Sequence, residues 1–326
     1  MINPGETPLV SVCMITYNHG PYIRKAIEGI LMQKCPFPYE LVIGEDCSRD
    51  DTRAICSEFE LSDPRIRVLP AESNLGMLPN FFRTIEACSG KYIAFCEGDD
   101  YWTDPQKLTR QVEFLENNPG FGMVCTDYKK LFQSSGIVRN RCFTSQGYVS
   151  EVFFSDYFTD MSTISTATVM AERNLIDQYL KETDPALRNR FYVGDSPMWL
   201  FVAAKSRIGV LPFETAVYRI LDNSACHITS DEKHFSFVMN GLATAEYFLV
   251  KYGNSEPSLM TIIERKRHKA AMYHAFKTRD KGMAKATWRE MRKTPAGPKL
   301  RLWAMIMLTG ASSGIGAALA RALLSE

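Results

Sequence analysis

Residues 74–102 read NLGMLPNFFRTIEACSGKYIAFCEGDDYW, and this stretch decides the fold class. Residues 79–87 have a helical pattern of apolar positions. The short apolar run YIAFC at 92–96 predicts a strand buried on both faces, and it ends in the acidic tetrapeptide EGDD at 97–100. A helix that leads into a buried strand with polar residues at its carboxyl end is typical of open α/β sheets, which bind ligands at that edge.

The residues before this stretch show the same alternation of strands and helices. LVSVCMIT at 9–16, YELVIG at 39–44 and residues 66–69 predict three more short strands. Pro21 is well placed at a helix start, and Asp50 or Asp51 can cap the next helix. This order predicts a mostly parallel sheet with helices on both faces.

After residue 121 the order of elements changes. Residues 122–131, 165–171 and 208–218 predict strands, whereas 104–116 and 198–204 predict helices. From about residue 231 onward the pattern is helical. We therefore expect an α/β domain over residues 1–225 and a mainly helical, basic region over residues 226–326.

The composition is that of an ordinary globular protein. The chain has 326 residues, 45% of them hydrophobic, and a net charge of +1, so we expect neither disorder nor nucleic-acid binding. Nine cysteines without a CxxC pair predict reduced thiols. Neither a signal peptide nor a membrane-spanning apolar run is present in the sequence, which predicts a cytoplasmic location.

Polar residues follow three of the predicted strands. Thr16, Tyr17 and Asn18 end the first strand, Glu45 and Asp46 end the second, and Glu97, Asp99 and Asp100 end the fourth. Five acids at one edge repel one another, and a divalent cation with phosphate would balance them. The alternative interpretation is that these acids only cap helices.

Four segments carry a family resemblance: VSVCMITYN at 10–18, VIGEDCSRDDT at 42–52, residues 74–102 and VGDSPMW at 193–199. In order and spacing they resemble the family-two glycosyltransferases of the GT-A fold, over residues 9–220. The resemblance implies a metal-dependent, inverting hexosyl- or related glycosyltransferase. It would move a sugar from a nucleotide diphosphate sugar, with uridine as the expected base, to a saccharide or lipid-linked acceptor in cell-surface polysaccharide synthesis.

The resemblance also implies roles for single residues. Thr16, Tyr17, Asn18 and Glu45 would lie at the nucleotide, and Asp46 would receive the base N–H; the family more often has aspartate where Glu45 stands. Asp99 would approach the ribose and the metal, and Asp100 would be the main ligand of Mn²⁺ or Mg²⁺. Glu97 and Asp99 also have an acid-x-acid spacing, so which pair holds the metal stays open.

Asp195 matches the family's catalytic base, which takes the proton of the acceptor hydroxyl. The alternative is that Asp195 is only a helix cap, and Asp156 and Asp160 are weaker candidates for the base.

Other residues are candidate substrate contacts. The family's phosphate-facing arginine is absent before the fourth strand, and Arg83 is a possible replacement. Arg219 either faces the diphosphate or forms a structural salt bridge. Tyr101 and Trp102 either stack on a sugar ring or pack in the core.

The C-terminal region has two further features. Thirteen basic residues and two acids lie between Arg265 and Arg301. They form either a solvated surface or, over residues 265–305, a contact with an anionic membrane surface on the inner face of the membrane. TGASSGIG at 309–316 resembles the cofactor loop of short-chain dehydrogenases, but ten residues follow it, too few for a dinucleotide fold, so we expect no such site.

Two other classes of function remain open at this point. A sugar nucleotidyltransferase could use a related α/β sheet, although its glycine- and basic-rich phosphate loop is absent after the first strand. A catalytically silent protein that binds nucleotide or glycan is the other alternative, and the presence of Asp99, Asp100 and Asp195 together argues against it.

Overall fold

A computed structural model describes residues 7–143, 150–155, 164–221, 230–253 and 257–293 of the chain. The chain divides into two compact units, Met1–Ser224 and Ala225–Glu326. Asp156, Asp160, Cys226, the C-terminal part of the basic segment and the glycine-containing segment 309–316 lie outside the described residues.

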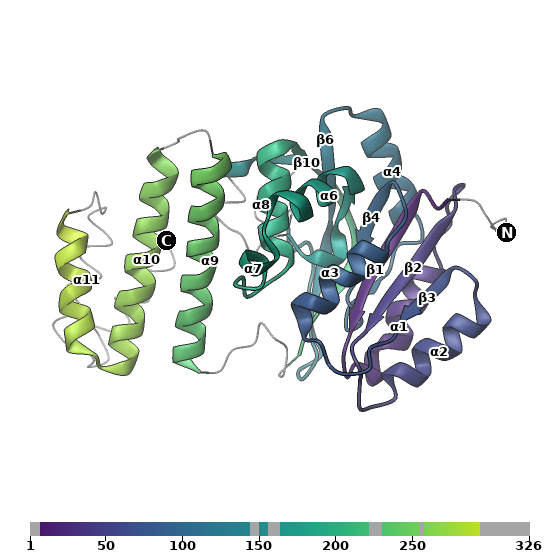
Figure 1. Ribbon diagram of the computed structural model, residues 1–326, viewed down its shortest axis with the longest axis horizontal. Coiled ribbons are helices and arrows are strands. Elements are labelled where there is room, and N and C mark those ends of the chain that lie inside the picture. Colours follow the sequence, from purple (N-terminus) through teal and green to yellow (C-terminus); the bar gives the residue numbers. More distant parts are fainter. Residues whose placement is uncertain (1–6, 144–149, 156–163, 222–229, 254–256, 294–326) are drawn as a thin grey trace. The chain divides into compact units, whose positions relative to one another are not determined.

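The first unit is built on one sheet with the strand order β3-β2-β1-β4-β9-β6-β10-β5 (Figure 1). Its parallel half consists of β3 (Ile66–Leu69), β2 (Tyr39–Glu45), β1 (Val10–Thr16) and β4 (Tyr92–Phe95). Val10 pairs with Tyr39 on one side and with Tyr92 on the other. β1 is therefore central, and its carboxyl end lies between those of β2 and β4.

The connecting helices lie on both faces of this parallel half. α1 (Gly20–Leu31) and α2 (Thr52–Ser62) link strands that step outward from β1, whereas α3 (Met77–Ala87) returns the chain to β4. Because such crossovers are right-handed, α3 lies on the opposite face from α1 and α2, as Figure 1 shows. These elements confirm the predicted α/β fold.

The second half of the sheet is mixed. β9 (Met170–Glu172) is antiparallel to both β4 and β6 (Phe121–Phe132). β10 (Arg207–Ile220) runs parallel to β6, and β5 (Tyr101–Trp102) is antiparallel to β10. β7 (Ile137–Arg139) pairs antiparallel with β6, and β8 (Glu151–Val152) pairs antiparallel with β10. The sequence pattern did not predict β5, β7 or β8.

The strand predicted over residues 165–171 is wrong in its first half. Residues Thr166–Thr168 form a 3-10 turn, η2, and only then does β9 begin. The Thr168 hydroxyl donates to the carbonyl of Ser165 at 2.6 Å, so a local bond replaces a strand pairing.

Four helices complete the described part of the first unit. They are α4 (Lys107–Asn117), α6 (Arg173–Glu182), α7 (Pro185–Arg188) and α8 (Asp195–Lys205). The helix predicted over 198–204 thus begins three residues earlier, at Asp195 itself.

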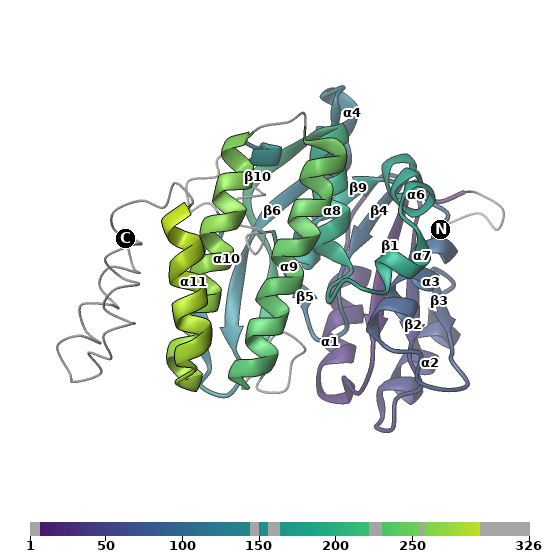
Figure 2. The same ribbon diagram turned by 60° about the vertical axis from the view of Figure 1, so that its left-hand side comes forward.

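The second unit is helical in the residues that the structure describes. α9 (Asp231–Tyr252), α10 (Pro257–Thr278) and α11 (Lys281–Lys293) lie side by side, as Figures 1 and 2 both show. The Ser230 hydroxyl caps α9 by accepting from the main-chain N–H of Lys233. No described helix is long and apolar enough to cross a membrane.

Gly44 makes the close contact between β2 and α3 possible. A Cβ atom at this position would lie 2.0 Å from Thr84 Oγ1 and 2.8 Å from Asn80 Oδ1. We predict that Gly44→Ala lowers the free energy of unfolding by about 2 kcal/mol, because overpacking displaces α3. Denaturant unfolding measures this change.

Gly241, in the middle of α9, provides a control of opposite sign. A Cβ atom there meets nothing within 4 Å, so Gly241→Ala should stabilise by up to about 1 kcal/mol. Equal stability of the wild type and Gly44→Ala would contradict the described contact between β2 and α3.

Candidate active site

The carboxyl ends of β2, β1 and β4 meet at one edge of the sheet. The main-chain N–H of Asp46 donates to the carbonyl of Thr16 at 3.1 Å, and that of Gly98 donates to the carbonyl of Ile15 at 3.0 Å. The three polar segments singled out in the sequence are therefore adjacent in space, as parallel strands require.

His19 joins the first of these segments to the third. Its Nδ1 lies 3.2 Å from Thr16 Oγ1, and its Nε2 lies 4.0 Å from Asp99 Oδ2. A Cβ atom on Gly98 would lie 2.5 Å from Thr16 Oγ1, so glycine allows this close packing. No local sequence pattern around His19 indicates this role, because both of its partners are brought to it by the fold.

Asn18 links the β1 loop to the loop that follows β2. Its backbone is left-handed, with φ of 54°, a conformation that asparagine tolerates better than most residues. Its N–H donates to Ser48 Oγ at 3.0 Å, and its side-chain oxygen accepts from the N–H of Arg49 at 2.9 Å. Tyr17, beside it, is exposed.

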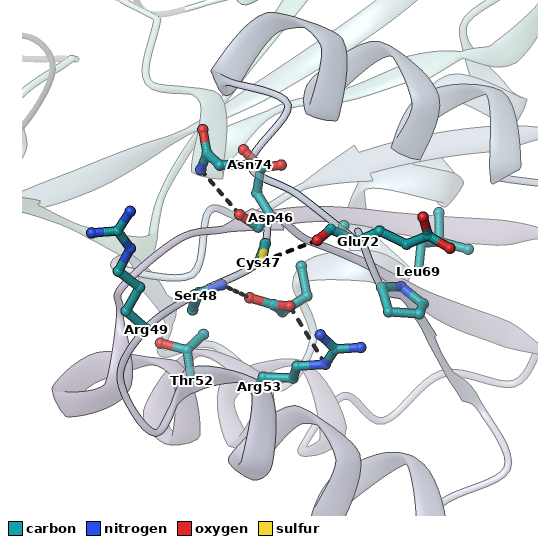
Figure 3. Close-up of polar contacts among 12 residues, drawn as sticks. Asp46, Cys47, Ser48, Arg49, Thr52, Arg53, Leu69, Glu72 and Asn74 are labelled. Atoms are coloured by element: carbon teal, nitrogen blue, oxygen red, sulfur yellow. Dashed lines mark hydrogen bonds and ion pairs between the residues drawn. The ribbon is translucent and has the colours of Figure 1, made fainter.

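Asp46 organises the loop that leads into α3 (Figure 3). Its buried carboxylate accepts from the N–H groups of Leu75 and Gly76 at 2.8 and 3.0 Å, and its carbonyl accepts from the Asn74 side chain at 3.0 Å. Each carboxylate oxygen has a second acceptor position, so a base N–H can still be accommodated. The role of Asp46 at the base stays a prediction.

Glu45 and Arg83 are both tied to the protein at the ends of β2 and β3. Glu45 is fully buried; one carboxylate oxygen accepts from the N–H of Ser48 at 2.6 Å, and the other lies 4.0 Å from Arg53 Nε (Figure 3). The Arg83 guanidinium donates to the carbonyls of Glu45 and Leu69 at 2.9 and 3.0 Å. These contacts give Arg83 a structural role, and its predicted phosphate contact has no support in this geometry.

The acids after β4 form the most electrostatically strained part of the site. Asp100 is 1% exposed; its Oδ1 accepts from the N–H of Arg219 at 2.8 Å, while its buried Oδ2 has no hydrogen-bond partner. Burial, with Asp99 and Glu97 nearby, raises the pKa of Asp100 well above its usual range. Burial, with Asp99 and Asp195 nearby, raises the pKa of Glu97 to about 8.

This donor set fits a divalent cation that shares its coordination with a ligand. A buried carboxylate oxygen without a partner is a hard oxygen donor of the kind that Mg²⁺ and Mn²⁺ take. Within the described ranges, no group of three or more His, Cys, Asp and Glu side chains is arranged to hold a metal by itself. The remaining ligands would then come from a bound phosphate or water.

Asp195 lies close enough to this acidic cluster to interact with Glu97 electrostatically. It is the first residue of α8, and its two carboxylate oxygens accept from Thr166 Oγ1 at 2.7 Å and from the N–H of Ser196 at 2.6 Å. Gly194, not Asp195, occupies the N-cap position of α8. One of the two bonds of this carboxylate thus comes from the first turn of α8, and the other comes from Thr166, which lies outside that helix, so helix capping accounts for only one of them.

The aromatic residues after the acidic segment have different surroundings. Trp102 is buried, donates from Nε1 to the carbonyl of Ala167 at 2.8 Å and has the Lys107 ammonium over its ring at 4.5 Å. The partly exposed Tyr101 has the Arg219 guanidinium over its ring at 4.6 Å. Trp102 thus packs in the core.

Arg219 lies over two aromatic rings. Its guanidinium lies 5.1 Å from the ring centroid of Tyr22 and 4.6 Å from that of Tyr101, and it donates to Gln133 Oε1 at 3.1 Å. Its Nε is buried without a hydrogen-bond partner. Among the described residues no ion pair holds Arg219, so the salt-bridge interpretation lacks support.

Comparison with known sequences points to one family. The profile of Glycosyl transferase family 2 matches residues 11–170. An uncharacterized protein of Mycobacterium tuberculosis is 41% identical over 111 residues, 34% of this chain and 32% of that protein. A Bacillus subtilis protein named as the teichuronic acid biosynthesis glycosyltransferase TuaG is 39% identical over 108 residues, 33% of this chain and 42% of that protein. The matched stretch thus spans less than half of these relatives.

Solved structures share the fold over nearly the whole chain. The Staphylococcus aureus protein TarS (1–349), in complex with UDP-GlcNAc, superposes with a TM-score of 0.61 at 14% identity, covering 96% of this chain and 90% of TarS. The mannosyltransferase PcManGT of Pyrobaculum calidifontis, in complex with GDP-Man and Mn²⁺, has a TM-score of 0.61 at 17% identity, covering 99% of this chain and 86% of PcManGT. At these identities the likeness concerns the fold.

A buried lysine, at the first position of α4, packs against Trp102. Lys107 is fully buried, donates to Gln111 Oε1 and lies 3.4 Å from the carbonyl of Thr168. Burial lowers the pKa of its ammonium to about 7, from an ordinary value of 10.5. The folded state therefore holds this proton less tightly than the unfolded chain does.

We predict that the wild type gains about 2 kcal/mol of unfolding free energy from Lys107 between pH 6.5 and 8.5. In this window the unfolded chain keeps the Lys107 proton and the folded protein loses it, so stability rises with pH. Lys107→Met removes the titrating group and should lack this increment. Denaturant unfolding of both proteins at several pH values measures the difference. If the unfolding free energies of the two proteins changed equally with pH, the lowered pKa of Lys107 would be refuted.

Proposed function

Since residues 11–170 match glycosyl transferase family 2, we propose that this protein is an inverting glycosyltransferase that uses a nucleotide diphosphate sugar. One observation carries the proposal. Asp100 holds a buried oxygen without a partner at the edge of the sheet where three strands deliver polar side chains. A cation with a diphosphate satisfies that oxygen, and a nearby carboxylate, Asp195, serves as the base.

The donor is proposed to lie across the ends of β1, β2 and β4. Thr16, Tyr17 and Asn18 would border the nucleotide, with a uridine base near Asp46. The solved structures that share this fold were determined with UDP-GlcNAc or GDP-Man, which supports a nucleotide sugar without fixing the base. The relative named for teichuronic acid biosynthesis supports a saccharide or lipid-linked acceptor.

Asp100 would hold Mn²⁺ or Mg²⁺ together with Asp99, and Glu97 lies within electrostatic reach of both. When bound, the cation supplies positive charge that stabilises the departing diphosphate. Neutralisation of the cluster would also allow Asp100 and Glu97 to stay ionised.

The transfer step is a single displacement. The acceptor hydroxyl oxygen forms a bond to the anomeric carbon while the bond from that carbon to the diphosphate oxygen breaks. The electron pair of the broken bond leaves with the nucleotide diphosphate, and the hydroxyl proton passes to the Asp195 carboxylate. Attack opposite the leaving group inverts the anomeric centre.

We predict that Mn²⁺ strengthens the binding of UDP to the wild type and has no such effect on Asp100→Asn. The amide keeps the side-chain volume but loses the charge that holds the cation. Calorimetric titration with UDP, with and without Mn²⁺, measures this. Asp104→Asn, four residues further on in the ion pair with Arg110, is the matched control and should behave as the wild type. Equal Mn²⁺ effects in all three proteins would contradict the metal assignment.

We predict that Asp195→Asn lowers the rate of UDP release from UDP-sugars by about 10² to 10⁴-fold, because an amide cannot take the acceptor proton. UDP affinity should be unchanged. Asp177→Asn, which removes an exposed carboxylate on α6 that pairs with Arg173, is the control and should keep the wild-type rate. Turnover of Asp195→Asn near the wild-type rate would end this assignment.

We also propose that the basic segment binds anionic lipid at the inner face of the membrane. Its described part, residues 265–293, has 11 lysines and arginines against two acids. On α11, Lys285, Arg289 and Arg292 are exposed at helical spacing, which places them on one face. A lipid-linked acceptor would then be presented close to the enzyme.

Flotation with vesicles of phosphatidylglycerol and phosphatidylcholine tests this contact. The triple change K285Q/R289Q/R292Q should weaken membrane partitioning by about a hundredfold, since each basic residue near an anionic surface contributes roughly 1 kcal/mol. Vesicles of phosphatidylcholine alone are the control. Equal flotation of the wild type with both kinds of vesicle would disprove an electrostatic contact.

A further inference from the structure

The turn η2, which precedes β9, is held by side chains from two other elements. Trp102 Nε1 donates to the carbonyl of Ala167 at 2.8 Å, and Gln111 Nε2 donates to the carbonyl of Thr168 at 2.8 Å. Lys107 Nζ reaches the same Thr168 carbonyl at 3.4 Å. All five of these residues are at most 2% exposed. Three side-chain donors therefore fix two consecutive carbonyls of one buried turn.

The same turn presents a hydroxyl to Asp195. Thr166 Oγ1 donates to Asp195 Oδ2 at 2.7 Å, the usual length for a hydroxyl bound to an oxygen acceptor. The other carboxylate oxygen accepts from the N–H of Ser196 at 2.6 Å. With one donor on each oxygen, the plane of the carboxylate is defined, and the remaining acceptor positions are left for a substrate.

We infer that Thr166 is a positioning residue for Asp195: its hydroxyl, fixed by the buried turn, holds the carboxylate in the orientation that receives the acceptor proton. This inference rests on the proposed function, since it gives Asp195 the role of base. Thr166 does not touch the reacting atoms itself. It acts through Asp195 only.

The connection to the acidic segment strengthens this inference. Trp102 follows Asp100 by two residues, and its indole is bonded to the residue next to Thr166. One chain of contacts thus runs from the proposed cation ligand through Trp102 and the turn to Asp195.

A turn that served stability alone would not need a buried lysine as a hydrogen-bond donor. Burying the Lys107 ammonium without a carboxylate bonded to it is costly, and apolar packing at that position is the usual solution. The polar cluster instead holds main-chain carbonyls at fixed positions. Accurate placement of a catalytic side chain depends on such supporting contacts.

In the transfer step, the acceptor oxygen bonds to the anomeric carbon as its proton moves to a free position on the Asp195 carboxylate. The Thr166 hydroxyl keeps its own proton throughout and donates to Oδ2 before and after the transfer. Removing the hydroxyl leaves the base present and held by its bond to the N–H of Ser196 alone. The expected loss is therefore smaller than that from removal of the base itself.

Three substitutions test the inference by UDP or GDP release from UDP-glucose, UDP-N-acetylglucosamine and GDP-mannose, with water as acceptor. Thr166→Val keeps the shape and removes the hydroxyl, and Thr166→Ser keeps the hydroxyl. Thr84→Val is the control for loss of a buried hydroxyl, since Thr84 Oγ1 donates to the carbonyl of Asn80 within α3. Nucleotide affinity is measured for every variant by calorimetry, and thermal unfolding is followed.

We expect Thr166→Val to lower kcat about 10- to 100-fold with unchanged nucleotide affinity, and Thr166→Ser to stay within about threefold of the wild type. Thr84→Val should lose thermal stability but keep kcat. The inference is overturned by wild-type kcat in Thr166→Val, by equal losses in the valine and serine variants, or by loss of nucleotide binding in Thr166→Val. Absence of turnover in the wild type with every probe would overturn the proposed function, and this inference with it.

Discussion

The pairing of β1 with β2 on one side and β4 on the other is the constraint on which the rest of the structure depends. Because all three strands run parallel, their carboxyl ends lie side by side. Everything that follows these strands is thereby brought to one edge of the sheet. The main-chain N–H of Asp46 is bonded there to the carbonyl of Thr16, and that of Gly98 to the carbonyl of Ile15, so the loops cannot separate without loss of strand ends.

This convergence has an electrostatic consequence. Glu97, Asp99 and Asp100 follow one strand, and α8 adds Asp195 within reach of Glu97. Burial and mutual repulsion raise the pKa values of Glu97 and Asp100, so the protein alone does not stabilise their charged forms. Such a cluster is expected where a positively charged ligand lowers the free-energy cost of ionising buried carboxylates. Groups with strongly shifted pKa values are concentrated at functional sites.

The parallel half of the fold could be predicted from the sequence because its signals are local. Apolar runs of strand length alternate with helical patterns, and the polar residues stand directly after the strands. The mixed half depends on long-range pairing: β5 is two residues long and pairs with β10 more than a hundred residues later. No local pattern in Tyr101 and Trp102 predicts that they pair with β10.

The site residues also divide into those that the local sequence indicates and those that only the fold reveals. The acids after β4 could be found from their position, whereas His19 and Thr166 could not, since their roles rest on contacts with Asp99 and Asp195 across the fold. Trp102 was left between two interpretations because a sequence does not show where an indole points. In the structure the indole of Trp102 is buried in the core and donates a hydrogen bond to the carbonyl of Ala167.

The most direct test of the account is a crystal structure of the protein with UDP and Mn²⁺. We expect Mn²⁺ to be bound to Asp100 and to the diphosphate, with the nucleotide across the ends of β1 and β2. Anomalous scattering from manganese identifies the ion without ambiguity. A nucleotide bound elsewhere, or an ion that does not contact Asp100, would contradict the proposal that the buried carboxylate is the cation site.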